Sequence, residues 1–339
     1  MQAQAFLDSL TADPAETENL LHVQELPARS PSVTPFPDDL PQLLVSRLAL
    51  LGVEGLYPHQ VSGLAALRAG RHVMLATGTA SGKSLVYQIE AAEAVLTTPK
   101  ATALFLFPTK ALARDQLRAL RALKLSQVKA AVYDGDTPQA ERPLIRRNAN
   151  VLLTNPDMLH LALLADHARW ADFLLRLSLI VVDEAHVFRG VFGSHVSMVL
   201  RRLRRLISVH GGDPRWCLAS ATVGNPGELA ERLTGLDVDV VLEDAAPRGR
   251  KLFALWNPPI VDEDSGARRS ALSEASTVMT RLVDDGAGRG RQAQWSPGDR
   301  SASWRRKPER CDGAWRAAAF FVVQYGARRP DIMGVPRAR

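Results

Sequence analysis

The sequence predicts an α/β fold in which a parallel β-sheet is covered by helices on both faces. Segments of strand length alternate with segments of helical length, and the strands are apolar at nearly every position rather than at every second one. A Gly-Lys-Ser sequence follows one such strand and begins a helix. Small and polar residues follow several other strands, and ligands bind where parallel strands end.

Composition narrows the possible classes of protein. With 339 residues, 46% of them hydrophobic, the chain can bury the core of one large domain or two ordinary ones. The net charge of +6 is moderate and fits a polyanionic partner. Cys217 and Cys311 are far apart and lack metal-ligand spacing, which favours a reducing compartment. Since neither a membrane-length apolar run nor a signal-peptide pattern occurs, we expect a cytoplasmic protein with no membrane partner.

The first elements precede the central motif. Residues 1–41 are expected to form an N-terminal extension, with a short helix near 5–10 and then prolines that leave the segment loosely packed. Helices are predicted at 43–51 and 58–69. Gln60 lies in the first turn of the second helix, and its amide offers the donor and acceptor that the edge of adenine requires. A glutamine exposed to solvent at a helix start is the alternative.

The central motif lies between an apolar strand at 73–76 and a helix that begins at Lys83. Small residues let successive backbone N–H groups surround phosphate oxygens, and the helix N-terminus adds more such groups. Lys83 would supply a cation to the terminal phosphates, and the Ser84 hydroxyl would bind Mg²⁺. The predicted nucleotide-binding residues of this P-loop are Thr79, Ala80, Ser81, Gly82, Lys83 and Ser84.

One position departs from the usual P-loop pattern. Thr77 stands where the motif normally begins with glycine. An ordinary Gly/Ser turn with a chance lysine is the alternative interpretation, but the strand before it and the helix after it favour a P-loop.

Three further strands, predicted at 101–107, 128–133 and 150–153, end in short polar segments. The segments are Pro108-Thr109-Lys110, Asp134-Gly135-Asp136 and Thr154-Asn155-Pro156. They offer hydroxyls, cations and a glycine that permits close approach, as a nucleic-acid backbone requires. Each segment alone also fits a plain capping turn before a helix, and helices are predicted from 111, 138 and 157. Their position on one rim favours a shared role.

A second motif follows the apolar strand predicted at 177–182, where Asp183-Glu184-Ala185-His186 places two carboxylates at a strand tip. Adjacent residues of a strand point in opposite directions, so the two carboxylates can have different tasks. Asp183 would hold Mg²⁺ through its water shell, opposite Ser84. Glu184 would orient and deprotonate the attacking water. A strand-end turn with solvated charges is the alternative.

The remaining elements complete the predicted layer. A helix at 196–209 carries Arg201, Arg204 and Arg205 on one face, which is either a nucleic-acid patch or a solvated surface. A strand at 216–218 leads to Ser220-Ala221-Thr222 at the rim. A helix at 226–233 and strands at 238–242 and 251–256 are expected to finish the sheet.

These motifs, in their order and rough spacing over about residues 56–222, resemble superfamily 2 DEAD/DEAH-box helicases. The wording of 77–84 and of Phe188-Arg189-Gly190-Val191-Phe192-Gly193-Ser194-His195 looks most like the bacterial mitomycin-repair type of DEAH-box DNA helicase. The resemblance implies a RecA-like domain, spanning 42–259, that uses ATP and Mg²⁺ to translocate on single-stranded DNA or on a duplex with an overhang.

The resemblance also implies roles for individual residues. Lys83, Asp183 and Glu184 would carry the chemistry, and Gln60 would contact adenine. The residues implied in coupling hydrolysis to motion are His186, Ser220 and Thr222, and those implied in touching the strand backbone are Thr109, Lys110, Gly135 and Thr154.

The chain departs from the family after residue 259. Helicases of this type hydrolyse ATP between two RecA-like domains, and the second domain supplies arginines. Residues 260–285 resemble a linker and the leading helix of that domain, but the sequence from 286 to 339 is basic and lacks strand–helix alternation, apart from a strand-like run at 320–323. We hypothesise a frame-shifted or truncated replacement; a disordered nucleic-acid-binding tail is the alternative.

Three functions therefore stay open at this point. The first is the motor half of a DNA helicase, and the second is a nucleotide-gated nucleic-acid-binding module without productive ATP turnover. The third is a P-loop protein that acts on something other than nucleic acid.

Overall fold

A computed structural model describes residues 3–12, 17–282, 293–297 and 319–324. The chain forms two compact units. Pro31–Ala246 make the larger unit, and the smaller unit combines residues from Met1–Ser30 and Pro247–Arg329.

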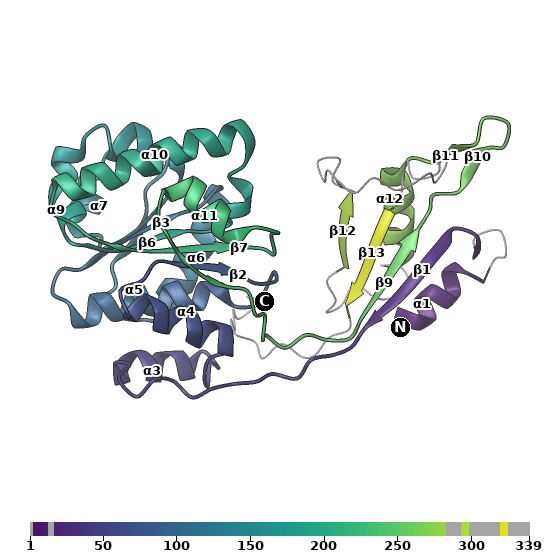
Figure 1. The fold of residues 1–339 in the computed structure, drawn as a ribbon, viewed down its shortest axis with the longest axis horizontal. Coiled ribbons are helices and arrows are strands. Elements are labelled where there is room, and N and C mark those ends of the chain that lie inside the picture. Colours follow the sequence, from purple (N-terminus) through teal and green to yellow (C-terminus); the bar gives the residue numbers. More distant parts are fainter. Residues whose placement is uncertain (1–2, 13–16, 283–292, 298–318, 325–339) are drawn as a thin grey trace. The chain divides into compact units, whose positions relative to one another are not determined.

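The larger unit is built on a seven-stranded sheet, in which every adjacent pair of strands is parallel (Figure 1). The order of the strands across the sheet is β4-β5-β3-β6-β7-β2-β8. Their bounds are β2 Val73–Ala76, β3 Thr102–Leu106, β4 Ala130–Val132, β5 Val151–Thr154, β6 Leu177–Val182, β7 Arg215–Ser220 and β8 Asp239–Val241. This confirms the predicted fold class.

Helices cover both faces of this sheet. Packed on one face are α3 Gln42–Leu50, α4 Pro58–Arg68, α5 Lys83–Thr97 and α6 Lys110–Ala122. Packed on the other are η1 Leu159–Leu163, η2 His167–Trp170, α9 Ala171–Leu175, α10 Gly190–Val209 and α11 Pro226–Thr234. Shorter helical segments are α7 Arg142–Asn148, α8 Pro156–Met158 and η3 Ala185–Val187.

The two cores explain why the strands are apolar at successive positions. In β2, Val73 and Leu75 face the core under α4 and α5, whereas Met74 and Ala76 face the core under α10. Successive side chains of a strand point to opposite faces, so a sheet that is buried on both sides requires an apolar residue at each position.

The smaller unit has its own sheet and its own core. Its sheet has the order β1-β9-β13-β12, and all three pairings are antiparallel. The bounds are β1 Leu20–Leu26, β9 Lys251–Trp256, β12 Ala293–Pro297 and β13 Ala319–Gln324, with the short strands β10 Ile260–Asp262 and β11 Ala267–Arg268 beside them. Helices α1 Ala3–Leu10 and α12 Ala271–Leu282 pack apolar residues against β9.

Two expectations about these segments were wrong. Residues 20–26 are not a loose lead-in but strand β1, which pairs with β9 along its length. The strand at 251–256 does not complete the parallel sheet. Its side chains are buried only at alternate positions, as in a sheet with one covered face. Its buried residues, Leu252, Ala254 and Trp256, pack on Phe6 and Leu10 of α1.

The C-terminal segment was expected to contain one strand-like run, at 320–323. That run lies within β13, and β12 is a second strand that the sequence did not reveal. The rest of 286–339 lies outside the described residues. Among the described helices, none has the length and apolarity that would let it cross a membrane.

Candidate nucleotide-binding site and rim

The P-loop joins the end of β2 to the start of α5. Gly82 has φ of 82°, in the left-handed region, and a Cβ placed on it would lie 2.5 Å from Gln60 Nε2. The left-handed backbone favours glycine at this position, and any larger residue would also have to displace the Gln60 amide. Thr77, at the unusual first position, is buried, and its hydroxyl lies 2.7 Å from the Ser81 hydroxyl. The departure from glycine is therefore accommodated by a hydrogen bond within the loop.

Lys83 folds back over this loop. Its ammonium group donates to the carbonyl oxygens of Thr77 at 2.9 Å and Gly78 at 2.7 Å. Burial lowers the pKa of Lys83, while the negative charges of Glu184 and Asp183 oppose that shift. The lysine thus lies among the loop residues with acidic groups close enough to act on its charge.

Two side chains from the first turn of α4 reach the same loop. Gln60 is buried; its Nε2 donates to the Gly82 carbonyl at 2.8 Å, and its Oε1 accepts from the Tyr57 backbone N–H at 2.8 Å. His59 Nε2 lies 3.0 Å from the Ser81 carbonyl, and Ala245 N–H donates to His59 Nδ1 at 3.4 Å. Gln60 therefore lies beside the P-loop with its amide bonded to backbone, and it is not exposed to solvent.

The acidic motif lies at the tip of β6. Asp183 is buried, and its carboxylate accepts two hydrogen bonds: from the Tyr87 hydroxyl at 2.9 Å and from the Glu184 backbone N–H at 2.9 Å. Burial raises the pKa of Asp183 to about 6. Glu184 has φ of 50°. A left-handed backbone is uncommon for a residue with a side chain and marks a strained turn at this point.

One of the predicted coupling residues, His186, lies next to Glu184. His186 Nδ1 lies 3.2 Å from Glu184 Oε2 and 3.4 Å from the backbone nitrogen of Ala221. Ser220 is fully buried, and its hydroxyl has no hydrogen-bond partner in the described part of the chain. Thr222 is exposed. The acidic motif and the segment after β7 are thus in direct contact through His186.

The first two rim segments also meet. The Thr109 hydroxyl caps α6 by accepting from Leu112 N–H at 3.3 Å. Lys110 Nζ lies 2.6 Å from Asp136 Oδ1, and a Cβ placed on Gly135 would lie 3.7 Å from Lys110 Nζ. Thr109 and Gly135 are exposed. The structure therefore brings three of the four predicted strand-contacting residues to one exposed rim.

Thr154, the fourth, is placed differently. It is buried, and its hydroxyl donates to the Tyr133 carbonyl at 2.6 Å. The side chain ties the ends of β4 and β5 together and does not reach the surface. A hydroxyl at a strand end can satisfy a neighbouring carbonyl as readily as a ligand, and the sequence alone does not distinguish the two.

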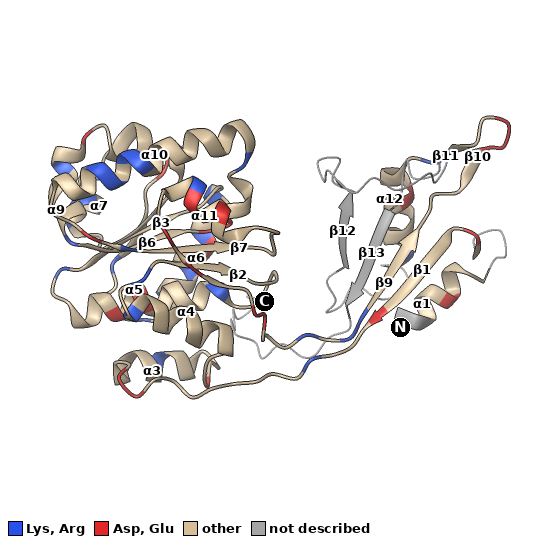
Figure 2. Ribbon diagram, in the orientation of Figure 1, with Lys and Arg blue, Asp and Glu red and all other residues tan. Residues whose placement is uncertain are grey.

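Helix α10 carries basic residues, drawn blue in Figure 2, and two of its arginines bond backbone carbonyls. Arg204 donates to the carbonyls of Thr234 and Gly235, at 2.8 and 3.0 Å, at the end of α11. Arg202 donates to the Leu164 carbonyl at 2.9 Å, after η1. These bonds satisfy carbonyls that a helix end leaves without partners. They favour a structural role over a nucleic-acid patch for this part of α10.

Sequence reasoning missed three residues of this site. Tyr87 follows Lys83 by one helical turn, and His59 adjoins Gln60; both positions were signals that could have been used. Asp244 had no signal. A Cβ placed on Gly78 would lie 2.7 Å from Asp244 Oδ2, so this carboxylate borders the P-loop.

The fold and site define a P-loop NTPase class, with a phosphate-binding loop after β2 and an acidic pair after β6 on one parallel sheet. The model of the DEAD/DEAH box helicase family matches residues 57–229. The chain belongs to the DEAD/DEAH box helicase family, which confirms the resemblance found in its motifs.

Among curated proteins, the chain is 40% identical over 280 residues to the uncharacterized ATP-dependent helicase YprA of Bacillus subtilis, covering 82% of this chain and 37% of YprA. It is 41% identical over 238 residues to the ATP-dependent helicase HRQ1 of Saccharomyces cerevisiae, covering 68% of this chain and 22% of HRQ1. A crystal structure of the helicase MrfA bound to DNA aligns with a TM-score of 0.77 and 37% identity, over 84% of this chain and 38% of MrfA.

Proposed function

We propose that the chain is the ATP-binding motor domain of a DEAH-type DNA helicase. It spans little more than a third of YprA and of MrfA, 37% and 38%, so the activity of a whole helicase is part of this proposal. The observation that carries it is the 2.9 Å hydrogen bond from Tyr87, on the P-loop helix, to Asp183 of the acidic motif, because it brings the two halves of an ATP site together.

The residues present fit ATP and Mg²⁺. The P-loop has the left-handed glycine that a phosphate-binding turn requires, and Lys83 is a cation held only by loop carbonyls among the bonds described. Asp183 is a buried carboxylate whose pKa is raised to about 6 by burial, and a divalent cation beside it would favour its ionised form. When bound, Mg²⁺-ATP would supply the phosphoryl group and the charge that these residues balance.

The residues of the chain would have different roles in binding and hydrolysing ATP. Ser84 and Asp183 would hold the cation, and Lys83 would turn from the loop carbonyls to the phosphates. Glu184 would orient a water molecule and accept its proton. Gln60 would keep the P-loop in place through Gly82 and contact the base.

The rim would bind the nucleic acid. Thr109, Lys110 and Gly135 are together there, and backbone contacts with phosphates need cations and close approach rather than a base code. MrfA is bound to DNA in its crystal structure, and relatives named Hel308 are DNA helicases. Both support single-stranded DNA, or a duplex with an overhang, as the partner.

Among the described residues, the sheet of Pro31–Ala246 is the only parallel one. We propose that residues 260–285, which include helix α12 Ala271–Leu282, are a linker and the leading helix of a second RecA-like domain. An arginine supplied by a partner domain is typically worth about 10³–10⁵ in rate. The motor domain of Pro31–Ala246 by itself would therefore hydrolyse ATP slowly. A nucleotide-gated DNA-binding module without turnover is the second candidate, because the described residues form only one side of the cleft that helicases of this type use.

A reducing, cytoplasmic compartment completes the proposal. Cys217 is a free, buried thiol in β7.

The claim of DNA binding is tested by the affinity of the full chain for fluorescent single-stranded DNA, with and without a non-hydrolysable ATP analogue and Mg²⁺. We expect the analogue to change the affinity for DNA in the wild type but not in Lys83→Met. No DNA affinity in any condition would favour a P-loop protein that acts on another partner.

A further inference from the structure

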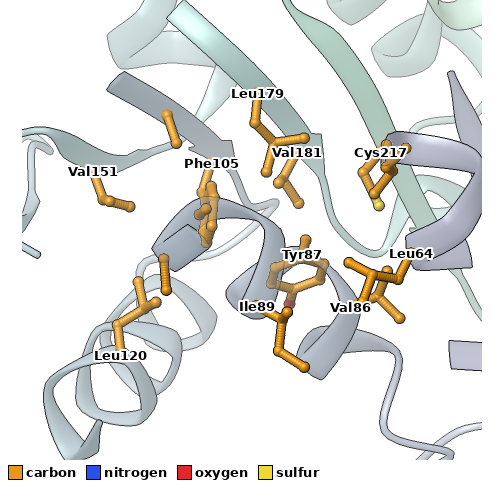
Figure 3. Packing of buried hydrophobic residues seen from close by; sticks show 14 of the residues in the cluster. Leu64, Val86, Tyr87, Ile89, Phe105, Leu120, Val151, Leu179, Val181 and Cys217 are labelled. Atoms are coloured by element: carbon orange, nitrogen blue, oxygen red, sulfur yellow. The ribbon is translucent and has the colours of Figure 1, made fainter. Parts of the chain in front are cut away.

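Tyr87 is a polar side chain in an apolar core. Its ring is fully buried and meets the Phe105 ring edge-on at 5.2 Å (Figure 3). Val86 and Ile89 on the same helix, with Val181 of β6, belong to the same core cluster. A phenylalanine would fill nearly the same volume here without bringing an oxygen atom into the core.

The presence of the Tyr87 hydroxyl in this apolar core therefore requires an explanation. Burying a hydroxyl without a partner is unfavourable, so buried tyrosines keep a hydrogen bond. The bond described for this hydroxyl is to Asp183 Oδ2, at 2.9 Å. A phenol hydroxyl is a donor, and in this bond it donates its proton to the carboxylate.

Tyr87 lies on the same helix, α5, as the P-loop residues Lys83 and Ser84. Ser84 and Lys83 precede Tyr87 by three and four residues, and side chains at these spacings share one helix face. One rigid turn thus carries the P-loop cation, the hydroxyl for the metal and the donor to Asp183. The carboxylate is held from its other side by Glu184 N–H at 2.9 Å.

We propose that Tyr87 is a positioning residue for Mg²⁺: its hydroxyl fixes the Asp183 carboxylate relative to Ser84, so that both groups meet the same cation. Two hydrogen bonds fix the plane of the carboxylate and leave its remaining lone pairs for the water shell of the cation. This inference rests on the proposed ATP site.

The test uses Tyr87→Phe in the full chain. The measurement is binding of a fluorescent ATP analogue as a function of Mg²⁺ concentration, and separately in excess chelator. We expect the Mg²⁺ concentration at half-saturation to rise roughly 10-fold, the lower end of the loss seen when a partner of a metal ligand is removed. Binding in chelator should stay unchanged, because the phosphate-binding loop is intact.

Tyr133→Phe is the matched control. It removes the same atom from another buried tyrosine, whose ring packs on Trp170 at 5.3 Å rather than beside Asp183. Its Mg²⁺ midpoint should equal that of the wild type. A double variant, Tyr87→Phe with Asp183→Asn, should show no further loss beyond Asp183→Asn, since the tyrosine acts through that carboxylate.

Each other outcome has a distinct meaning. An unchanged Mg²⁺ midpoint in Tyr87→Phe would overturn the inference, and so would an equal loss of binding with and without Mg²⁺, which marks a structural role. If the wild type itself shows no Mg²⁺-dependent binding of the analogue, the proposed ATP site fails instead.

Discussion

His186 Nδ1 faces Glu184 Oε2 at 3.2 Å, and the same nitrogen faces the backbone N–H of Ala221 at 3.4 Å. A ring nitrogen that carries a proton can donate to the carboxylate, whereas a bare one can accept from the N–H. It cannot do both at once. The link between the acidic motif and the segment after β7 is therefore a choice between two bonds.

Replacing this imidazole should separate hydrolysis from its coupling. In His186→Ala, Glu184 and Ala221 lose their common partner, while the P-loop bonds of Lys83 and Gln60 are untouched. We expect the affinity for an ATP analogue to stay within about twofold of the wild type and the DNA stimulation of turnover to be lost. An equal loss of analogue affinity and turnover would contradict a coupling role.

Gly82 offers a sharper test of the P-loop. Alanine there would need a left-handed backbone, and its Cβ would displace Gln60 Nε2, which lies at 2.5 Å from the position of that atom. We expect Gly82→Ala to lower stability by about 1–2 kcal/mol and to abolish binding of the analogue. Gly70→Ala, also at positive φ but with open space around it, is the control for backbone strain alone. Wild-type binding in Gly82→Ala would refute the site.

Asp183 makes stability depend on pH. Its folded pKa of about 6 lies above its ordinary value of 3.8, so the folded state binds this proton more tightly than the unfolded state. The free energy of unfolding should fall as pH rises from about 4 to 6 and then stay lowered, by up to about 3 kcal/mol from this group.

Asp183→Asn removes the ionisable carboxyl group, and with it the loss of stability that the charged group causes at higher pH. Without nucleotide or Mg²⁺, the variant should be more stable than the wild type at pH 8 and nearly equal to it at pH 4, as measured by urea unfolding. A variant that is less stable than the wild type by the same amount at both pH values would contradict the assignment.

The smaller unit depends on the first residues of the chain. Deleting residues 1–26 removes α1 and β1, and with them the part of the apolar cover of Leu252, Ala254 and Trp256 that α1 supplies beside α12. We then expect limited proteolysis to cut the chain between 247 and 282 faster than it cuts within Pro31–Ala246. Equal protection of 247–282 in the full and shortened chains would show that the N-terminal segment is dispensable.

The sequence predicted those parts of the molecule that local patterns determine. The strand before Asp183 and the helix start at Lys83 depend on neighbouring residues, and the prediction named them correctly. The helix predicted from 111 begins one residue earlier, at Lys110. Partners distant in sequence were not predicted. Tyr87 and Asp183 are 96 positions apart, and the ion pair of Glu25 with Arg250 spans 225 positions.

These distant pairs follow from tertiary packing, which no local pattern shows. The strand at 251–256 carried the correct secondary structure but was assigned to the wrong sheet, because a short apolar run does not reveal its neighbours. The inward turn of the Thr154 hydroxyl was hidden for the same reason.

ATP turnover by the purified chain, with and without single-stranded DNA, tests the central claim most directly. Glu184→Gln keeps the size of the side chain and removes the base, so it is the matched control. We predict slow turnover that DNA stimulates and that Glu184→Gln abolishes. Tight, Mg²⁺-dependent ATP binding with no turnover that depends on Glu184 would contradict a motor domain and identify a nucleotide-gated binding module.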